Sequence, residues 1–262
     1  MRILVTGHEG FIGQNMVKAL SDHDLTLCEW GDQYSLYEID RVIHLGAISD
    51  TRCQDWVALK NQNVEFSITL IEQCQEHGIP IQVASSASVY GPNNTTFRED
   101  DPIEPANLYA ESKALVEQYV QKMTLSSPVQ IFRYFNVYGP HEDHKGDQAS
   151  PFHKFREQAK TGTVRIFEGS AHFKRDFIHV DQVIGIHKKF FDVGESGIWN
   201  VGTGNTLSFE GVAALANAEF SAKIETIPIP NNLVGYQKFT KADLSKLTLT
   251  INKSHTKELV NA

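Results

Sequence analysis

MRILVTGHEGFIG, at residues 1–13, is the stretch that decides the fold of this chain. Residues 3–5 predict a short buried strand, and the apolar spacing after them predicts a helix. Gly7, Gly10 and Gly13 lie on the turn between the two, in the spacing Gly-x-x-Gly-x-x-Gly. Such a turn brings backbone N–H groups and a helix N-terminus to one point, where a pyrophosphate can bind. The stretch therefore predicts the first strand–helix unit of a dinucleotide-binding sheet.

Strands and helices alternate along the first half of the chain. Strands are expected at residues 2–6, 25–29, 41–45, 80–84 and 129–133, and helices at 11–21, 54–77 and 108–124. This alternation predicts an α/β fold with a Rossmann-type, doubly wound parallel sheet. The later pattern is less regular, with helices expected at 152–160, 181–191 and 208–219 and a strand at 163–167. We predict a dinucleotide-binding domain at residues 1–135 and a small substrate lobe at 136–262, interleaved with the last elements of the sheet.

Composition and charge exclude several classes of partner. The chain has 262 residues, 41% of them hydrophobic, and a net charge of −8. That charge argues against nucleic acid or an anionic membrane as the main partner. Cys28, Cys53 and Cys74 show no metal-ligand spacing and are typical of reduced thiols in a cytoplasmic protein, so no metal is expected. No apolar run approaches a membrane span, and the N-terminus does not resemble a signal peptide.

Tyr109 and Lys113 lie four residues apart in the helix expected at 108–124. Side chains at this spacing share a helix face, so the ammonium can lie beside the phenol. A nearby cation stabilises the phenolate and lowers a tyrosine pKa that is normally about 10. Tyr109 is therefore a candidate base for a hydroxyl proton. Solvated helix faces also carry such pairs, and the glycine turn upstream is what favours the catalytic interpretation.

A serine cluster follows the strand expected at 80–84, in QVASSASVYG at residues 82–91. Ligands of open α/β sheets bind at the carboxyl ends of the strands, where these hydroxyls would stand. Ser86 is the candidate functional serine, and Ser85 is the alternative. A serine-rich loop that only caps the next helix is the remaining interpretation.

These three motifs, in this order, resemble the extended short-chain dehydrogenase/reductase superfamily, which contains sugar-nucleotide epimerases and dehydratases. The resemblance covers nearly the whole chain and extends to HLGA at residues 44–47, Asn63, RYFNVYGP at 133–140 and RDFIHV at 175–180. Within that superfamily, three further stretches are similar to the ADP-L-glycero-D-manno-heptose 6-epimerases. They are EDHKG at 142–146, FEGS at 167–170 and FKRDF at 173–177.

The resemblance implies a transient oxidation. An NAD(P)-dependent epimerase of this kind converts a sugar carbon to a ketone and reduces it again on the opposite face. It implies that Ser86 holds the reacting oxygen, that Tyr109 is the base, and that Lys113 holds the nicotinamide ribose. Lys145 would be a second acid or base, which serves the other face of the ketone. The alternative for Lys145 is a lysine that only binds a phosphate.

The resemblance also implies the binding residues. For NAD(P) they are Gly7, Gly10, Phe11, Ile12, Gly13, Glu29, Leu45, Gly46, Ala47, Asn63, Tyr109, Lys113 and Val137. For a nucleotide-diphosphate sugar they are Ser86, Asn136, Lys145, His153, Phe167, Glu168, Gly169, Ser170, Arg175 and Tyr236. Arg175 suits a diphosphate because a guanidinium offers paired donors to its oxygens. A homo-oligomer is expected as well.

Two departures from the superfamily pattern concern the edge of the sheet and the C-terminus. Only residues 30–40 separate Glu29 from the strand at 41–45, where a full Rossmann sheet has another helix and an edge strand. We expect that edge strand to be missing or reduced to a short turn at 34–39, which opens the adenine side and weakens cofactor binding. The chain also ends soon after Lys257, short of the superfamily's usual closing helix.

Cofactor choice and reaction type stay open in the sequence. Glu29, at the end of the second strand, favours NAD because a carboxylate there binds the ribose hydroxyl and repels a 2′-phosphate. The heptose epimerases that the chain resembles mostly use NADP. Dehydratases carry an acidic pair where this chain has Ala87 and Ser88, which argues against dehydration. A 4-epimerase, a 4-reductase and a non-catalytic NAD(P)-binding protein are the alternatives.

Overall fold

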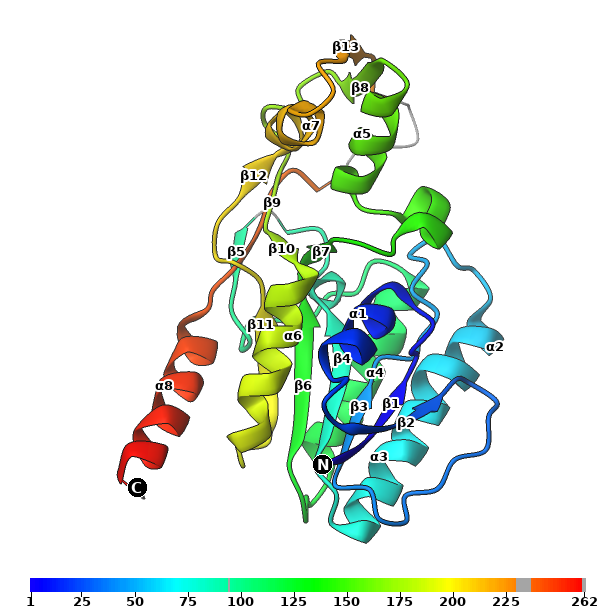
Figure 1. The fold of residues 1–262 in the computed structure, drawn as a ribbon, viewed down its shortest axis with the longest axis vertical. Coiled ribbons are helices and arrows are strands. Elements are labelled where there is room, and N and C mark those ends of the chain that lie inside the picture. Colours follow the sequence, from blue (N-terminus) through cyan, green and yellow to red (C-terminus); the bar gives the residue numbers. More distant parts are fainter. Residues whose placement is uncertain (94, 230–236, 261–262) are drawn as a thin grey trace.

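Six parallel strands form the central sheet of the larger lobe of the molecule (Figure 1). The structure is a computed structural model that describes residues 1–93, 95–229 and 237–260. The strands are β1 (Arg2–Thr6), β2 (Asp24–Cys28), β3 (Arg41–His44), β4 (Ile81–Ser86), β6 (Val129–Tyr134) and β11 (Gly197–Val201), in the order β11-β6-β4-β3-β1-β2. The expected α/β fold with a doubly wound parallel sheet is therefore confirmed.

The register of β1 brings three strand ends together. Thr6 pairs with Cys28 of β2 on one side and with His44 of β3 on the other. The segments that follow these three strands begin with Gly7, Glu29 and Leu45, so they leave the sheet at the same level. A ligand at this edge would meet all three segments at once.

Helices cover both faces of the sheet. On one side lie α1 (Phe11–Ala19) and α6 (Val180–Lys189), and on the other lie α3 (Phe66–His77) and α4 (Leu108–Lys122) (Figure 1). The helix expected at 54–77 is present as α2 (Trp56–Leu59), a π-helical stretch η1 (Lys60–Glu65) and α3. Because both faces are covered, the inner strands are almost entirely buried, as parallel strands require.

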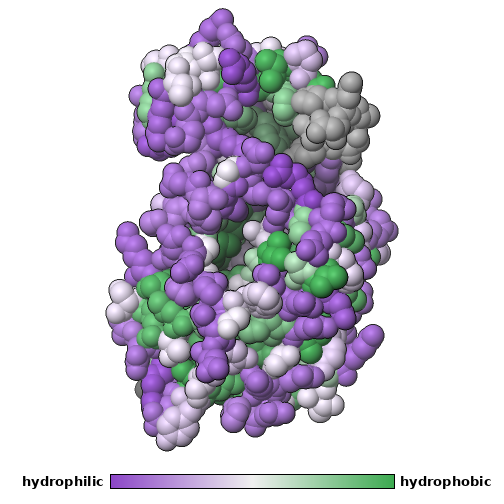
Figure 2. Space-filling view, turned by 90° about the vertical axis from the view of Figure 1, so that its right-hand side faces the viewer, coloured by the Kyte–Doolittle hydropathy of each residue, from purple (hydrophilic) through white to green (hydrophobic). Residues whose placement is uncertain are grey.

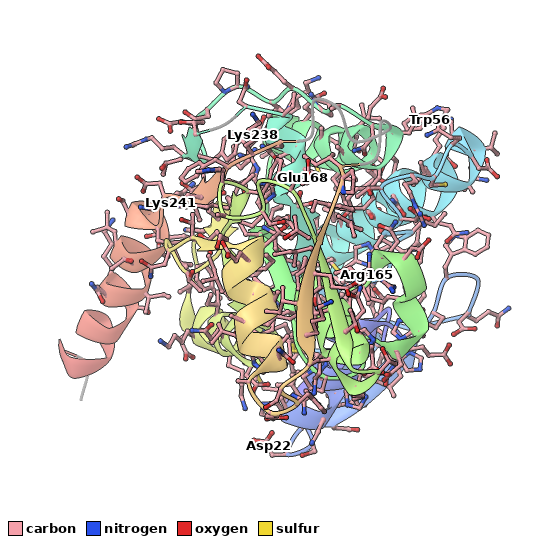
Figure 3. All side chains as sticks on the ribbon, turned by 90° about the horizontal axis from the view of Figure 1, so that it is seen from above. Asp22, Trp56, Arg165, Glu168, Lys238 and Lys241 are labelled. Carbon is pink, nitrogen blue, oxygen red and sulfur yellow. The ribbon has the colours of Figure 1, made fainter. Side chains whose placement is uncertain are left out.

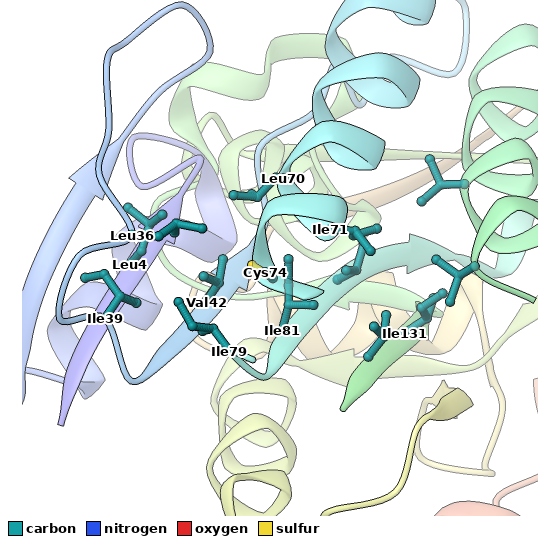
Figure 4. Packing of buried hydrophobic residues seen from close by; sticks show 14 of the residues in the cluster. Leu4, Leu36, Ile39, Val42, Leu70, Ile71, Cys74, Ile79, Ile81 and Ile131 are labelled. Carbon is teal, nitrogen blue, oxygen red and sulfur yellow. The ribbon is translucent and has the colours of Figure 1, made fainter. Parts of the chain in front are cut away.

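The segment between β2 and β3 contains neither a helix nor a strand, as expected. Leu36 and Ile39 from this segment are buried in the same core cluster as Leu4 and Val42 (Figure 4). They fill the place against the sheet that a longer connection would have covered. Losing the edge strand therefore leaves the core intact but exposes β2, and Trp30 just beyond it is 52% exposed.

A second lobe stands above the carboxyl ends of the strands (Figure 1). It contains α5 (Pro151–Lys160), α7 (Phe209–Asn217), β8 (Thr163–Phe167) and β13 (Lys223–Ile227), and β8 pairs with β13 in parallel. Phe155, Ile166 and Val212 form part of a separate core cluster in this lobe. In Figure 2 the surface is hollowed between the two lobes, and apolar residues show inside the hollow.

Short elements connect the two lobes. They are η2 (Ala87–Tyr90), β5 (Thr95–Phe97), β7 (Asn136–Tyr138), η3 (Asp143–Gln148), β9 (Lys174–Arg175), β10 (Phe177–His179), β12 (Leu207–Ser208) and β14 (Thr240–Ala242). A further short helix, η4 (Phe190–Asp192), follows α6 at the other end of the sheet, where Arg41 of β3 donates to the Phe191 oxygen. The buried Asp176 carboxylate, between β9 and β10, accepts the backbone N–H groups of Thr203 and Gly204, which follow β11, and of Ala242 in β14. Such a satisfied buried carboxylate fixes the connection between the lobes.

The C-terminal expectation needs a correction. We expected the chain to lack a closing helix, but its last described residues form α8 (Ser245–Val260), which lies beside the main body (Figure 1). Leu247 is buried against the cluster that contains Trp199, and the Trp199 indole donates to Thr250. Apolar and polar partners three to four residues apart thus dock one face of this helix.

Elements from the second half of the chain complete the first lobe. β11 pairs with β6 inside the central sheet, and α6 packs against α1. The second half of the chain thus contributes to the first lobe, and the division into a dinucleotide-binding domain at residues 1–135 and a substrate lobe at 136–262 stays a proposal. Within the described part of the chain, no helix is both long enough and apolar enough to cross a membrane.

Candidate active site

The glycine turn after β1 is closely packed at two glycines and open at the third. Gly7 has a φ of +72°, and a Cβ added there would lie 2.4 Å from the Gly46 nitrogen. A Cβ on Gly13 would lie 2.0 Å from the Gly7 oxygen. A Cβ on Gly10 would meet only that same oxygen, at 3.3 Å. Gly7 and Gly13 are therefore needed for packing, whereas Gly10 leaves space on its outer side.

This open side fits a dinucleotide phosphate. Gly10 is the N-cap of α1, and no side chain caps this helix. The first-turn N–H groups and the helix dipole thus face the space that a side chain at Gly10 would occupy. Phe11, the first residue of α1, is buried, while Ile12 is half-buried. The described turn therefore suits the pyrophosphate of NAD(P), as its spacing predicted.

Asn63 holds the loop that follows β3. Its side-chain oxygen accepts the Ile48 N–H at 2.8 Å, and its amide donates to the Ile48 oxygen at 2.9 Å and to Ser112 Oγ at 3.0 Å. Ser112 in turn donates to the Tyr109 carbonyl at 2.7 Å. Asn63 lies in η1, and π-helical turns are frequent at functional sites. Its observed contacts support the loop and α4, and direct contact with the cofactor stays a prediction.

A buried histidine, with no role of its own predicted from the sequence, supports the glycine turn. His44 lies 2.6 Å from Thr6 Oγ1 through one ring nitrogen and 2.7 Å from Ser67 Oγ through the other. Thr6 Oγ1 also accepts the Gly46 N–H at 3.3 Å. Burial and the nearby Lys113 charge lower the pKa of His44 to about 3, so its ring stays neutral. The sequence signals for it were the HLGA stretch at residues 44–47 and a polar residue at the end of the strand.

Ser86, Tyr109 and Lys113 meet at the end of β4. Ser86 is hydrogen-bonded to the Tyr109 phenol, and Ser88 Oγ donates to Ser86 Oγ at 2.9 Å. Lys113 donates from Nζ to the Ala84 oxygen at 2.9 Å. Tyr109 and Lys113 are both buried on α4, whose N-cap Asn107 accepts the Ala110 N–H. The structure thus brings together the three residues that the sequence had placed on two separate elements.

The electrostatics of Tyr109 differ from the expectation. We expected Lys113 to lower the Tyr109 pKa, but burial raises that pKa, and the hydrogen bond with Ser86 only partly opposes it. The physical reason is that the phenol is desolvated while the Lys113 ammonium is held by a backbone carbonyl. Burial also lowers the pKa of Lys113, to about 8.

Ser85 has a different partner from Ser86. Its Oγ donates to Glu117 Oε1 at 2.5 Å, and both residues are buried. A hydroxyl engaged by a buried carboxylate is not aimed at a ligand. Of the two serines left open by the sequence, Ser86 is therefore the better candidate for holding a substrate oxygen.

Glu29 lies against the glycine turn. Its carboxylate accepts the Glu9 N–H at 2.8 Å and lies 3.1 Å from His8 Nδ1. Its own N–H donates to Asp32. A ribose bound at the end of β2 would meet this carboxylate, as expected for an acid that favours NAD. Trp30, the next residue, is exposed, which agrees with an open adenine side, and weaker cofactor binding stays a prediction.

Lys145 approaches the same turn from the connecting segment. Its ammonium lies 5.3 Å from the centre of the Phe11 ring, and burial lowers its pKa while Glu142 opposes this. The Glu142 carboxylate shapes the segment by accepting the N–H groups of Gly139 and Ser150. Lys145 is thus a half-buried cation between the lobes. A role as acid or base and a role in binding a phosphate are both compatible with this position.

The remaining predicted substrate residues lie in or near the second lobe. Phe167 to Ser170 form a tight turn after β8, in which Gly169 has a φ of +76° and Ser170 donates back to the Phe167 oxygen. Figure 3 looks down on this lobe and shows Glu168 near the middle of that view. Ser170 therefore supports the turn with its hydroxyl, and Glu168 is left as the polar side chain of the turn.

Other predicted residues are held by the protein itself. Asn136 donates to the Asp176 oxygen, and the buried Arg175 guanidinium donates to the carbonyls of Lys174 and Gln237. His153 lies in the first turn of α5, half-buried. Leu45, Gly46, Ala47 and Val137 are half-buried at the strand ends. Tyr236 lies outside the described residues.

The comparison of the sequence with protein families decides the identification. A sequence model of the NAD dependent epimerase/dehydratase family matches residues 29–202, which is more than half of the chain. The chain belongs to the NAD dependent epimerase/dehydratase family. The matched range contains the Ser86, Tyr109 and Lys113 cluster, and the glycine turn of the family fold precedes it in this chain.

Solved structures share the fold of this epimerase/dehydratase family member. The ADP-L-glycero-D-manno-heptose-6-epimerase of Helicobacter pylori aligns with a TM-score of 0.84 and 22% identity, over 96% of this chain and 90% of that one. A UDP-N-acetylglucosamine 4-epimerase of Methanobrevibacter ruminantium, in complex with UDP-N-acetylmuramic acid, aligns with a TM-score of 0.83 and 24% identity, over 95% of this chain and 91% of that one. An NAD dependent NDP-hexosamine 5,6-dehydratase aligns with a TM-score of 0.79 and 24% identity, over 95% of this chain and 90% of that one.

Metal binding has no support in the described part of this family member. No group of three or more histidine, cysteine, aspartate and glutamate side chains there is arranged to hold an ion. The described cysteines are free thiols, and Cys28 and Cys74 are buried.

Proposed function

We propose that this protein is an NAD(P)-dependent sugar-nucleotide epimerase, and that its substrate is an ADP-glycero-manno-heptose that it inverts at carbon 6. The observation that carries the proposal is the contact of Ser86 with the Tyr109 phenol, beside Lys113 and at the strand edge that bears the glycine turn. These groups can remove and return a hydroxyl proton next to a dinucleotide.

The chain's own residues would handle the proton and the position of the sugar. Tyr109 accepts the proton of the reacting hydroxyl, and Ser86 hydrogen-bonds the same oxygen. Lys113 donates to the Ala84 oxygen with one N–H of its ammonium and would bind the nicotinamide ribose with the others. The bound dinucleotide supplies the hydride acceptor and donor. Inversion follows when the planar ketone is reduced on the opposite face.

Lys145 is proposed as the second acid or base of this reaction. Two observations support this role: the side chain is half-buried between the lobes beside Phe11, and burial lowers its pKa below the ordinary value of a lysine. With a second group, each face of the ketone receives its proton from its own donor. The ketone then only needs to rotate within the site between oxidation and reduction.

The heptose substrate is supported by the stretches around Lys145, Phe167 and Arg175, which resemble those of heptose epimerases. The fold similarity to the Helicobacter pylori enzyme agrees with it. A 4-epimerase is the second candidate, because the Methanobrevibacter ruminantium 4-epimerase aligns almost equally well. A 4-reductase shares the same serine, tyrosine and lysine and would not need Lys145.

NAD is the proposed cofactor because the Glu29 carboxylate lies at the turn where a 2′-phosphate of NADP would stand. The family name and the dehydratase relative both refer to NAD. The use of NADP by the heptose epimerases that the chain resembles keeps NADP as the alternative. A homo-oligomer is proposed from the same resemblance, and a cytoplasmic location from the three unpaired cysteines.

The function is tested by incubating the purified protein with each ADP-glycero-manno-heptose epimer and following the anomeric and carbon 6 protons by NMR. We expect the two epimers to interconvert to the same equilibrium mixture from either side. UDP-glucose and UDP-N-acetylglucosamine serve as comparison substrates. Interconversion of a UDP-sugar with no change in the heptose would replace the heptose assignment with the 4-epimerase.

Replacing Lys145 with methionine should stop epimerisation but leave the Tyr109 half of the reaction. An analogue with an aldehyde at the reacting carbon would still be oxidised or reduced, because that step needs only Tyr109. Lys160→Met is the matched control, since Lys160 pairs with Glu157 on an exposed helix face. The measurement compares kcat for epimerisation with kcat for the analogue. A raised KM with unchanged kcat would mean instead that Lys145 only binds a phosphate.

A further inference from the structure

Three consecutive residues of β4 each hold one residue of α4. The Ala84 oxygen accepts from Lys113 Nζ at 2.9 Å, Ser85 Oγ donates to Glu117 Oε1 at 2.5 Å, and Ser86 is bonded to Tyr109. Tyr109, Lys113 and Glu117 are four residues apart in turn, so they share one helix face. Along β4, the Ser85–Glu117 contact therefore lies between the two contacts that hold the proposed catalytic residues, and the three contacts together form the β4–α4 seam.

Glu117 is completely buried and is held by a second partner from the sheet. Arg133 of β6 donates to it through Nε, 3.1 Å from each oxygen, and through Nη2 at 2.6 Å. The two side chains are 0% and 1% exposed. Arg133 is fixed further by the Glu99 carbonyl at 3.2 Å and by the Tyr90 ring at 4.6 Å. Each oxygen of the carboxylate thus has a donor.

The need to fill the core does not by itself explain a buried ion pair. Buried ion pairs can often be replaced by apolar residues without loss of stability, because desolvation offsets their attraction. The pair lies one helical turn from Lys113, whose ammonium is also buried. Glu117 opposes the effect of burial on the Lys113 pKa. Because Arg133 occupies both oxygens of Glu117, the ammonium is left to the Ala84 carbonyl rather than drawn into a direct salt bridge.

The charged and titratable groups near this seam come from several elements. Glu117 and Tyr109 share α4 with Lys113, His44 faces it from β3, and Arg133 reaches Glu117 from β6. Tyr90 and Glu99 lie on the far side of Arg133. The His44 ring is neutral, so Glu117 is the group that favours the charged form of Lys113 and Arg133 is the group that limits it.

We propose that Glu117 and Arg133 are positioning residues of the active site: with Ser85 they fix the register of α4 on β4, and their opposite charges set the protonation of Lys113. Arg133 acts on Lys113 only through Glu117. This inference rests on the proposed function for its consequence in catalysis, but its physical content concerns Lys113 and can be measured without any substrate.

The test is a titration of the full-length protein followed by NMR of lysine side chains labelled at the ε carbon, with the Lys113 signal assigned from Lys113→Met. Glu117→Gln should lower the Lys113 midpoint by about one pH unit, because a buried carboxylate near the ammonium is lost. Arg133→Met should raise it, because Glu117 is left with only Lys113 to neutralise it. The double variant should keep the lowered midpoint of Glu117→Gln, because Arg133 acts on Lys113 only through Glu117.

Two further variants separate charge from shape. Glu117→Asp keeps the charge and should keep the Lys113 midpoint near the wild-type value. Compared with Glu117→Gln, it tests the role of the charge even if Arg133→Met does not fold. Ser85→Ala should leave the midpoint unchanged but lower kcat several-fold with an unchanged KM, because the register of Tyr109 loosens. Glu219→Gln, which breaks an exposed pair with Arg156, is the control.

A Lys113 midpoint that does not move in Glu117→Gln, or that moves in the same direction in Glu117→Gln and Arg133→Met, would overturn the inference. Failure of the proposed function would be seen differently, as no interconversion of any sugar nucleotide by wild-type protein. The titration distinguishes the two failures because it does not depend on turnover.

Discussion

Replacing Tyr109 with phenylalanine is expected to lower the turnover number by roughly 10²–10⁴, the usual contribution of a general acid or base. The ring stays, so its packing on α4 and the binding of sugar nucleotide should persist. Only the oxygen that contacts Ser86 is removed. Single-turnover measurements with the wild-type and variant proteins, together with substrate affinity by calorimetry, would separate the chemical step from binding.

Tyr119→Phe is the matched control for this variant. Tyr119 lies on the same helix, but its hydroxyl bonds Glu72 on the exposed side. Its loss should change turnover by less than about twofold, because exposed hydrogen bonds contribute little. Near-normal activity of Tyr109→Phe would show that another group is the base, and Lys145 would then be the first candidate to examine.

Replacing Gly10 with valine is expected to abolish cofactor binding in a folded protein. The backbone of Gly10 is extended, with φ −71° and ψ 167°, which valine adopts readily. A Cβ there contacts only the Gly7 oxygen, so the fold tolerates it. The branched side chain would fill the space in front of the α1 N-terminus. Losing two phosphate hydrogen bonds, about 3 kcal/mol or more, would raise the NAD(P) dissociation constant by roughly 100-fold or more.

Two other glycines serve as controls for this experiment. Gly13→Ala should prevent normal folding, because its Cβ would lie 2.0 Å from a backbone oxygen. Gly185→Ala, in α6 with nothing within 4 Å of the new carbon, should leave both fold and cofactor affinity unchanged. Circular dichroism checks the fold, and calorimetry with NAD and NADP measures the affinity. Unchanged affinity in Gly10→Val would contradict the assignment of the glycine turn to the cofactor.

Local pattern was enough for the elements of the sheet. The buried run at residues 3–5 and the apolar spacing after Gly10 depend on the period of strands and helices, which is a property of neighbouring residues. The same holds for the four-residue spacing of Tyr109 and Lys113. Ser86 was left open against Ser85 because both hydroxyls stand at the same strand end, and the sequence does not show that Ser85 bonds Glu117 while Ser86 bonds Tyr109.

Partners from distant parts of the chain could not be found in this way. The sequence did not show that Asn63 bonds the loop at Ile48 and Ser112, 49 residues away, and its contact with the cofactor stays a prediction. It also did not show the two backbone carbonyls that hold Arg175, whose role at a diphosphate stays a prediction. Hydrogen bonds are decided by which groups the fold leaves within reach, and this depends on the packing of whole elements.

The sequence by itself determined the order of strands and helices, the glycine turn, the serine, tyrosine and lysine at the strand end, and the missing connection after Glu29. Only the tertiary structure decided the protonation of the titratable groups and which residues cover the core next to the missing connection. It buries Tyr109 so that its pKa rises, places Leu36 and Ile39 over the sheet, and sets Arg133 on Glu117. The physical reason is that spacing along the chain fixes local geometry, whereas burial and charge pairing arise only when distant segments pack together.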